Sequence, residues 1–255
     1  MSLTLIGLGL CDYNDISLRG LEALKQADVV YFENFTNILA CSIKEMEKAY
    51  GRMITPVKRE FLEPGEGLIA EAQSRRVALL VIGDPLTATT HISLFLRAKE
   101  KGVAVEVIHN ASVMSAVAIT GLQPYKFGMT SSLPFPGSSF KPETAYEVIK
   151  RNKASGMHTL LLLDLKPDEG RFMGIGEAID ILLSIEEKRL DGVFATNTPC
   201  IGCARLGWPD CRIICGKASE LRKADFGKPP HCLVVPGSLH FVEEEAIGGY
   251  RLNHS

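Results

Sequence analysis

The stretch whose residue types are best suited to bind a ligand is Ile82–His91, with the sequence IGDPLTATTH. It follows the apolar run ALLVI at 78–82, which is typical of a buried strand, and it precedes an apolar pattern in 92–101 that predicts a helix. Glycine lets a ligand approach the backbone closely, and the carboxylate of Asp84 can accept hydrogen bonds. Ligands of open α/β sheets usually bind at the carboxyl ends of the strands, so this stretch is a candidate binding loop. Gly, Asp and Pro also form ordinary turns, and the local sequence leaves both interpretations open.

A second glycine loop, Gly7–Leu10, follows a short β-rich run at 2–6. It does not complete the dinucleotide fingerprint G-x-G-x-x-G, because Asp12 stands where the third glycine is required. The next predicted helix also begins too late, near Leu18, with Ser17 as a candidate N-cap. The loop therefore argues against a phosphate cradle, while its glycines still allow a ligand to lie at the end of the first strand.

The seven cysteines are an odd number, which argues against the disulfide framework of a secreted protein. Two pairs, Cys200 with Cys203 and Cys211 with Cys215, have spacings within reach of a zinc or iron–sulfur site. Small buried side chains or an incidental disulfide explain the same spacings. We expect no bound metal. Whether these four cysteines form a disulfide or bind a metal ion stays open.

Composition restricts the possible partners. The net charge is −2 and the isoelectric point is near 6.3, so no chain-wide basic surface predicts binding to nucleic acid. No apolar run reaches the roughly 18 residues that a membrane span needs, and the N-terminal segment lacks the basic region of a signal peptide. We therefore expect a cytoplasmic protein that binds neither nucleic acid nor membrane.

The first half of the chain alternates between predicted strands and helices. This alternation predicts an α/β domain with a mostly parallel sheet. The last predicted strand of this half ends in His109-Asn110-Ala111-Ser112, and Ser112 can N-cap a helix over 113–120. The predicted strands are 2–6, 29–32, 53–57, 78–82 and 103–108.

Proline and glycine cluster in 121–137, where helical periodicity disappears. We place the domain junction there, which gives an N-terminal domain over 1–122 and a C-terminal domain over 123–255. The second half repeats the alternation and predicts another α/β domain. Its predicted helices are 142–153 and 176–188, and its predicted strands are 158–164, 192–196, 212–215 and 232–235.

Several stretches, taken in this order, resemble the tetrapyrrole methylase superfamily of S-adenosylmethionine-dependent methyltransferases and, within it, the diphthine synthase family. Cobalamin-pathway and ribosomal-RNA members usually carry a G-x-G-P-G-D-P-type motif after the first strand, where this chain has GLGLCDYNDIS. The stretches are LIGLGLCDYNDISLRGLEAL at 5–24, ADVVYFENFT at 27–36, GDPLTATTHISLFLRAKEKG at 83–102, IHNASVMSAVAITGLQPYKFG at 108–128 and DFGKPPHCLVVPGSLHFVEEE at 225–245.

The resemblance implies two α/β domains of the tetrapyrrole methylase type, with the cofactor in the interdomain cleft, and a homodimer. It also implies successive N-methylations of the modified histidine on translation elongation factor 2, a step of diphthamide biosynthesis that forms the trimethylammonium group of diphthine. The cofactor would be S-adenosylmethionine, the product S-adenosylhomocysteine, and the source an archaeal-type cytoplasm. No metal and no dedicated catalytic acid or base is implied.

The resemblance also implies which residues contact the cofactor. Thr87 differs from the Val that is often found at its position, and Leu206 is likewise a side-chain variant, but contacts made by the backbone would tolerate both changes. The implied contacts are Leu10 after the first strand, Asp84 and Thr87 in the Gly-Asp-Pro loop, Ser112 and Val113 at the start of a helix, and Leu163, Leu206 and His231 in the second half.

Two alternatives remain open. One is a methyltransferase of the same superfamily that acts on a precorrin or another small molecule, against which the missing G-P-G-D-P motif counts. The other is a protein of this fold that binds the cofactor, or a partner, without catalysis. Transfer of a labelled methyl group to elongation factor 2 would distinguish among the three.

Overall fold

The computed structural model describes residues 1–137 and 142–251, and the chain divides into two compact units. Unit 1 comprises Met1–Ala116 with Pro167–Glu169, and unit 2 comprises Val117–Lys166 and the chain from Gly170 onward. The segment in which we predicted the junction, 121–137, contains a short 3-10 helix and a short strand. Within the described part of the chain, every helix is too short or too polar to cross a membrane.

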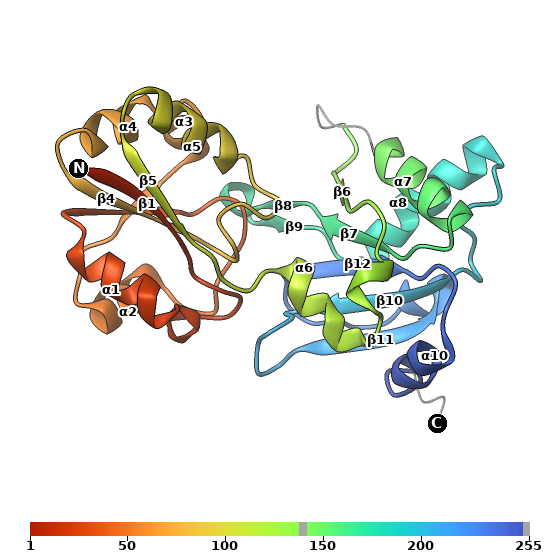
Figure 1. Cartoon of the computed structure of the whole chain (residues 1–255). Helices are drawn as coiled ribbons and strands as arrows, with labels where there is room; N and C mark the ends of the chain where they lie inside the picture. Colours follow the sequence, from red (N-terminus) through yellow and green to blue (C-terminus); the bar gives the residue numbers. More distant parts are fainter. Residues whose placement is uncertain (138–141, 252–255) are drawn as a thin grey trace. The chain divides into compact units, whose positions relative to one another are not determined.

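Unit 1 is built on a five-stranded sheet in which all neighbouring strands are parallel, as the alternation of strands and helices predicted. The strand order is β3-β2-β4-β1-β5, so β1 lies between β4 and β5. Their carboxyl ends therefore share one edge of the sheet (Figure 1). The strands are β1 Ser2–Gly7, β2 Val29–Glu33, β3 Thr55–Val57, β4 Arg76–Val81 and β5 Ala104–Ile108.

Helices cover both faces of this sheet because successive strand residues point to opposite faces. In β1, Leu5 belongs to a core cluster that includes residues of α3, α4 and α5, while Ile6 belongs to one that includes residues of α1 and α2. Figure 1 shows these two groups of helices on opposite faces of the sheet. The hydroxyl of Ser17 caps α1 by accepting a hydrogen bond from the Gly20 N–H, as predicted. The helices are α1 Leu18–Gln26, α2 Ile43–Tyr50, α3 Arg59–Leu62, α4 Glu66–Ala72 and α5 His91–Glu100, with a 3-10 turn η1 at Tyr13–Asp15.

Unit 2 contains a mixed five-stranded sheet of order β11-β10-β12-β7-β6. Only its β6–β7 pair is parallel, so this sheet differs from the one in unit 1. The strands are β6 Ser131–Leu133, β7 Thr159–Leu163, β10 Pro199–Ala204, β11 Arg212–Lys217 and β12 His231–Val235, with a small hairpin of β8 Leu165–Lys166 and β9 Arg171–Phe172. The helices are α7 Glu143–Ala154, α8 Ile175–Arg189, α9 Ala218–Leu221 and α10 Phe241–Gly248.

A buried carboxylate ties together three parts of unit 2. Glu243 of α10 accepts hydrogen bonds from the backbone N–H groups of Gln123 at 2.9 Å and His240 at 2.8 Å. Its carboxylate also bonds to Lys126 Nζ and lies 3.1 Å from Nε2 of His158. The Gly237 N–H donates to Nδ1 of His158, so the ring carries its hydrogen on Nε2 and donates it to Glu243. The segment around η3, Pro124–Lys126, is thereby fixed to the start of β7 and to α10.

The strand predicted over 192–196 is wrong. The carboxylate of Glu186 accepts the N–H groups of Gly192, Val193 and Phe194 at 2.7, 2.8 and 2.9 Å, so a side chain takes the donors that a neighbouring strand would need. The helix predicted over 113–120 is also shorter than expected, since α6 spans Val113–Ala116 and a 3-10 turn, η2, continues over Val117–Thr120.

The four cysteines with spacings within reach of a metal site lie in and beside β10 and β11. Cys200 and Cys203 belong to β10, which the sequence analysis missed, and Cys203 faces Cys232 across the sheet. All seven cysteines are free thiols. Over residues 1–137 and 142–251, no group of His, Cys, Asp or Glu side chains is arranged to hold a metal ion.

Candidate functional site

The loops that follow β4, β1 and β5 come together at one edge of the sheet in unit 1. The backbones of Gly9 and Gly83 bond to each other, with N···O distances of 3.3 and 2.8 Å. Five predicted cofactor contacts lie in these loops or in the helix that follows them. They are Leu10 after β1, Asp84 and Thr87 after β4, and Ser112 and Val113 at the start of α6.

Asp84 is 6% exposed and holds two of these loops together. Its Oδ1 accepts hydrogen bonds from the Leu86 N–H and the Thr87 hydroxyl, both at 3.0 Å. Its Oδ2 accepts from Nδ1 of His109 at 2.7 Å and from the Asn110 N–H at 3.2 Å. Burial raises the pKa of Asp84, but these four hydrogen bonds outweigh burial and hold the pKa below its ordinary value. The carboxylate is therefore ionised at neutral pH, and its acceptor capacity is used within the protein.

The loop after β1 is fixed by two further side chains. The amide nitrogen of Asn110 donates to the carbonyl oxygens of Gly7 and Asp15, both at 2.9 Å. The Asp15 carboxylate in turn accepts the N–H groups of Leu10 at 3.0 Å and Cys11 at 2.7 Å. Three strand ends are thus joined by side-chain hydrogen bonds within the protein itself.

Gly7 is required by this close packing. A Cβ atom at this position would lie 2.7 Å from the Gly83 carbonyl oxygen and 2.8 Å from Cβ of Asn110. We expect Gly7→Ala to lower the free energy of unfolding by about 1–3 kcal/mol, because backbone must move to admit the methyl group. Urea unfolding would measure the change. A Cβ at Gly248 of α10 meets no atom within 4 Å, so Gly248→Ala is the matched control. Equal stability of the Gly7→Ala protein and the control would contradict the packing argument.

The three predicted contacts in unit 2 also share one edge of their sheet. Leu163 ends β7, Leu206 follows β10, and His231 begins β12. Since β12 is antiparallel to both β7 and β10, its first residue lies beside their last residues, and His231 pairs directly with Ala204. Leu163 and Leu206 are buried, so this edge combines two apolar side chains with an imidazole.

His231 presents an unused hydrogen-bond acceptor. Its Nε2 lies 3.1 Å from the Lys228 carbonyl oxygen, which can only accept, so Nε2 carries the hydrogen. Burial lowers the pKa of His231, which favours the neutral ring. Its Nδ1 is buried and has no partner among the described residues. A buried acceptor of this kind suits a ligand that supplies an N–H or O–H group.

Arg205, which the sequence analysis missed, organises the segment that leads into β12. It is 5% exposed, and its backbone has a φ of 51°. Its guanidinium donates to the carbonyl oxygens of Phe226 and Lys228, and its Nε donates to the Asp210 carboxylate at 2.8 Å. The Lys228 carbonyl is also the partner of His231, so Arg205 fixes the acceptor that orients the imidazole. The sequence signal that could have drawn attention to Arg205 is a charged residue directly after the uncharged run CIGCA at 200–204.

Known proteins resemble the chain over nearly its whole length. The family model described as Tetrapyrrole (Corrin/Porphyrin) Methylases matches residues 2–222. A diphthine synthase of Methanocella arvoryzae is 43% identical over 96% of each chain, and a diphthine methyl ester synthase of Dictyostelium discoideum is 41% identical over 99% of each. A crystal structure of diphthine synthase superimposes with a TM-score of 0.90 at 39% identity, over 98% of this chain and 96% of the other. The chain therefore belongs to the tetrapyrrole methylase family and, within it, to the diphthine synthases.

Proposed function

We propose that the protein methylates the amine of the modified histidine on translation elongation factor 2 and so acts as a diphthine synthase. The observation that carries this proposal is the 43% identity to a diphthine synthase over 96% of each chain. The strand-end residues support it, because each unit gathers its predicted cofactor contacts at one edge of its sheet. The enzyme would work in the cytoplasm.

We propose S-adenosylmethionine as the methyl donor. When bound, it supplies a methyl group from its sulfonium and leaves as S-adenosylhomocysteine. The bare Nδ1 of His231 fits this ligand, since an amino or hydroxyl group of an adenosine can donate to it. Apolar contact would come from the residues of both edges, namely Leu10, Val113, Leu163 and Leu206. That the two edges enclose one cofactor in a cleft between the domains stays a prediction from the resemblance.

The chemistry makes modest demands on the side chains. Methyl transfer to an amine is an in-line displacement with a good leaving group, so the protein chiefly aligns the nucleophile and excludes water. The amine must be neutral, and an α-amino group has a pKa of about 8, so a useful fraction is deprotonated at neutral pH. Apolar surroundings disfavour the ammonium form and raise that fraction. No dedicated acid or base is needed for this step.

We propose that the 121–137 segment forms part of the surface that receives elongation factor 2. Two of its side chains support this, since Tyr125 is 77% exposed and Met129 is 58% exposed. Other side chains of the segment, Leu133 and Phe135, are buried in the core of unit 2, so substitution is a better test than deletion. The double variant Tyr125→Ala with Met129→Ala should raise the KM for the protein substrate without changing the affinity for S-adenosylmethionine.

We also propose a homodimer, which light scattering of the purified protein would test.

Labelled methyl transfer tests the proposed activity. The protein is incubated with methyl-labelled S-adenosylmethionine and elongation factor 2 that carries the unmethylated diphthamide precursor. We expect label in that protein, and mass spectrometry should locate a trimethylammonium group on the modified histidine. A precorrin serves as the competing acceptor. Label in the precorrin alone, or in neither acceptor, would contradict the proposal.

One further product is a candidate, because the Dictyostelium discoideum relative is named a diphthine methyl ester synthase. Such an enzyme would add a methyl group to a carboxylate as well as to the amine. Mild alkali separates the two products, since it releases methanol from an ester and leaves a methylated ammonium intact. Alkali-labile label would assign this chain the additional ester-forming step.

A further inference from the structure

Glu33 and His91 form a buried pair beside the Gly-Asp-Pro loop. Glu33 is the last residue of β2 and is 0% exposed, while His91 is the first residue of α5 and is 3% exposed. Oε2 of Glu33 lies 3.2 Å from Nε2 of His91. A carboxyl group buried to this extent is costly unless a partner compensates it, so the pair needs an explanation.

The other nitrogen of His91 faces the loop itself. Nδ1 lies 3.0 Å from the carbonyl oxygen of Pro85, and the hydroxyl of Thr89 donates to the same oxygen at 2.6 Å. A carbonyl oxygen only accepts, so Nδ1 must carry a hydrogen. The Pro85 carbonyl is therefore held by two donors from residues at or just before the start of α5.

Nε2 of His91 approaches Oε2 of Glu33 to 3.2 Å without forming a hydrogen bond. Both carboxyl oxygens of Glu33 are buried and have no hydrogen-bond partner among the described residues. Burial raises the pKa of Glu33, while His91, Thr36 and Arg59 act in the opposite direction. Burial prevails for Glu33, and the neutral carboxyl group is the form that its buried position tolerates best.

We propose that Glu33 and His91 are positioning residues that hold the Gly-Asp-Pro loop in its ligand-binding shape through the carbonyl of Pro85. This inference rests on the proposed function, in which that loop binds S-adenosylmethionine. Asp84 fixes the loop to the segment after β5, and His91 fixes the adjacent residue to the start of α5. Two side chains thus hold the Gly-Asp-Pro loop, namely Asp84 within it and His91 at the start of α5.

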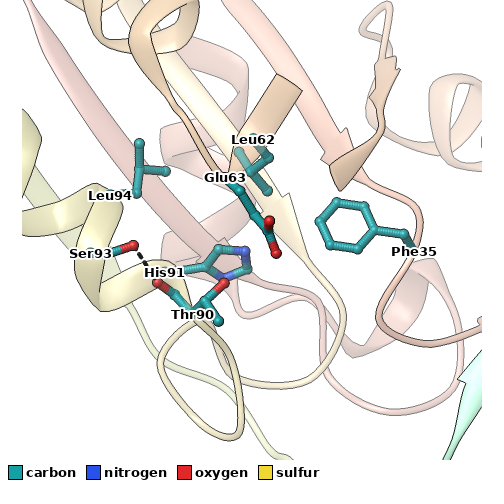
Figure 2. Close-up of a pocket in the computed structure, with 7 residues that line it drawn as sticks. All are labelled: Phe35, Leu62, Glu63, Thr90, His91, Ser93 and Leu94. Atoms are coloured by element: carbon teal, nitrogen blue, oxygen red, sulfur yellow. Dashed lines mark hydrogen bonds between the residues drawn. The ribbon is translucent and has the colours of Figure 1, made fainter. Parts of the chain in front are cut away.

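His91 is not itself one of the predicted cofactor contacts, but it bonds to Pro85, which adjoins Asp84. Its ring forms part of the wall of a small pocket in unit 1, shown in Figure 2. None of the predicted cofactor contacts lines this pocket, which is formed by Phe35, Leu62, Glu63, Thr90, His91, Ser93 and Leu94. A change at His91 would therefore reach the cofactor through Pro85.

Calorimetric titration with S-adenosylmethionine tests the inference on the full chain. His91→Phe keeps an aromatic ring but removes the hydrogen bond to the Pro85 carbonyl, and we expect the Kd to rise about tenfold. Glu33→Gln keeps a neutral side chain of similar shape beside Nε2 of His91, and we expect a Kd within about threefold of wild type. Tyr31→Phe is the matched control. Tyr31 lies in β2, as Glu33 does, and the substitution removes the hydrogen bond that Tyr31 Oη donates to the Glu71 carboxylate. This control should lose stability and keep its affinity.

A second measurement does not depend on any variant folding. Nitrogen-15 NMR of the histidine rings in the wild-type protein should show a hydrogen on Nδ1 of His91. A ring with a bare Nδ1 would overturn the inference. Unchanged affinity of the His91→Phe protein would also overturn it, provided that the NMR signals of the other histidine rings match those of the wild type and so show that the variant is folded. Failure of the wild-type protein to bind S-adenosylmethionine at all would instead overturn the proposed function, and this inference with it.

Discussion

Asp84→Ala is expected to weaken the binding of S-adenosylmethionine by more than about tenfold. The substitution removes an ionised acceptor that serves four donors, and it leaves the Leu86 and Asn110 N–H groups without their partner. The loops after β4 and β5 would then lose the group that joins them. Because the carboxylate is fully used within the protein, we expect the effect to come from the shape of the loop. Calorimetric titration of the purified variant measures it.

Two controls make the Asp84 result specific. Asp28 is a carboxylate at the opposite edge of the same sheet, where it bonds to the backbone and side chain of Arg76. Asp28→Ala should leave the affinity for S-adenosylmethionine unchanged. Thr87→Val removes one of the four hydrogen bonds to Asp84, so its effect should be smaller than that of Asp84→Ala. An unchanged Kd in Asp84→Ala would exclude the assigned role.

Glu243→Ala should have the largest effect on stability, a loss of about 3–5 kcal/mol in the free energy of unfolding. It would leave the buried Nε2–H of His158 and the Gln123 N–H without an acceptor, and it would remove the carboxylate that pairs with Lys126. The chain has one tryptophan, Trp208 in unit 2, so its fluorescence during urea unfolding reports on the affected unit. The exposed neighbour Glu244 is the matched control, and Glu244→Ala should change stability by less than about 0.5 kcal/mol.

The same carboxylate predicts how stability depends on pH. Burial raises the pKa of Glu243, but its hydrogen bonds, led by that from Lys126, prevail and lower the pKa to about 2. A depressed carboxyl pKa contributes stability above the unfolded-state value of about 4.3, and that contribution is lost as the pH falls from there towards 2. The stability of wild-type unit 2 should therefore fall steeply in this range. A Glu243→Ala protein with the same acid dependence would contradict the assignment.

The sheet of unit 1 could be predicted because strands such as β2 and β4 are mostly continuous apolar runs, and helices separate the strands. The sheet of unit 2 was harder to predict for local reasons. Strand β10 has the sequence PCIGCA, whose proline and glycine argue against a strand, although Gly202 is needed because a Cβ there would lie 2.4 Å from the ring of Phe226. The segment 192–196 has a strand-like composition, but the Glu186 carboxylate takes its N–H groups. Both errors come from contacts with residues outside the window that periodicity examines.

Part of the candidate site could likewise be predicted from the sequence and part could not. Positions at strand ends, such as Asp84 and Ser112, could be predicted, because parallel strands place their carboxyl ends at one edge. The side chains that hold these loops could not. His109 bonds to a residue 25 positions away, and Asn110 bonds to one 103 positions away. Such pairings depend on which strands become neighbours, and strand order is not encoded in local sequence pattern.

Asp15 has a consequence for ligand choice. Its carboxylate accepts hydrogen bonds from the N–H groups of Leu10 and Cys11 after β1. In other α/β folds the loop at this position binds the phosphates of nucleotides. A triphosphate brought to this loop would meet a negative charge and would find both donors occupied. An adenosine that carries a positive sulfonium and no phosphate escapes this repulsion. We therefore expect the loop to disfavour ATP and the dinucleotides, which share the adenosine group but carry phosphates.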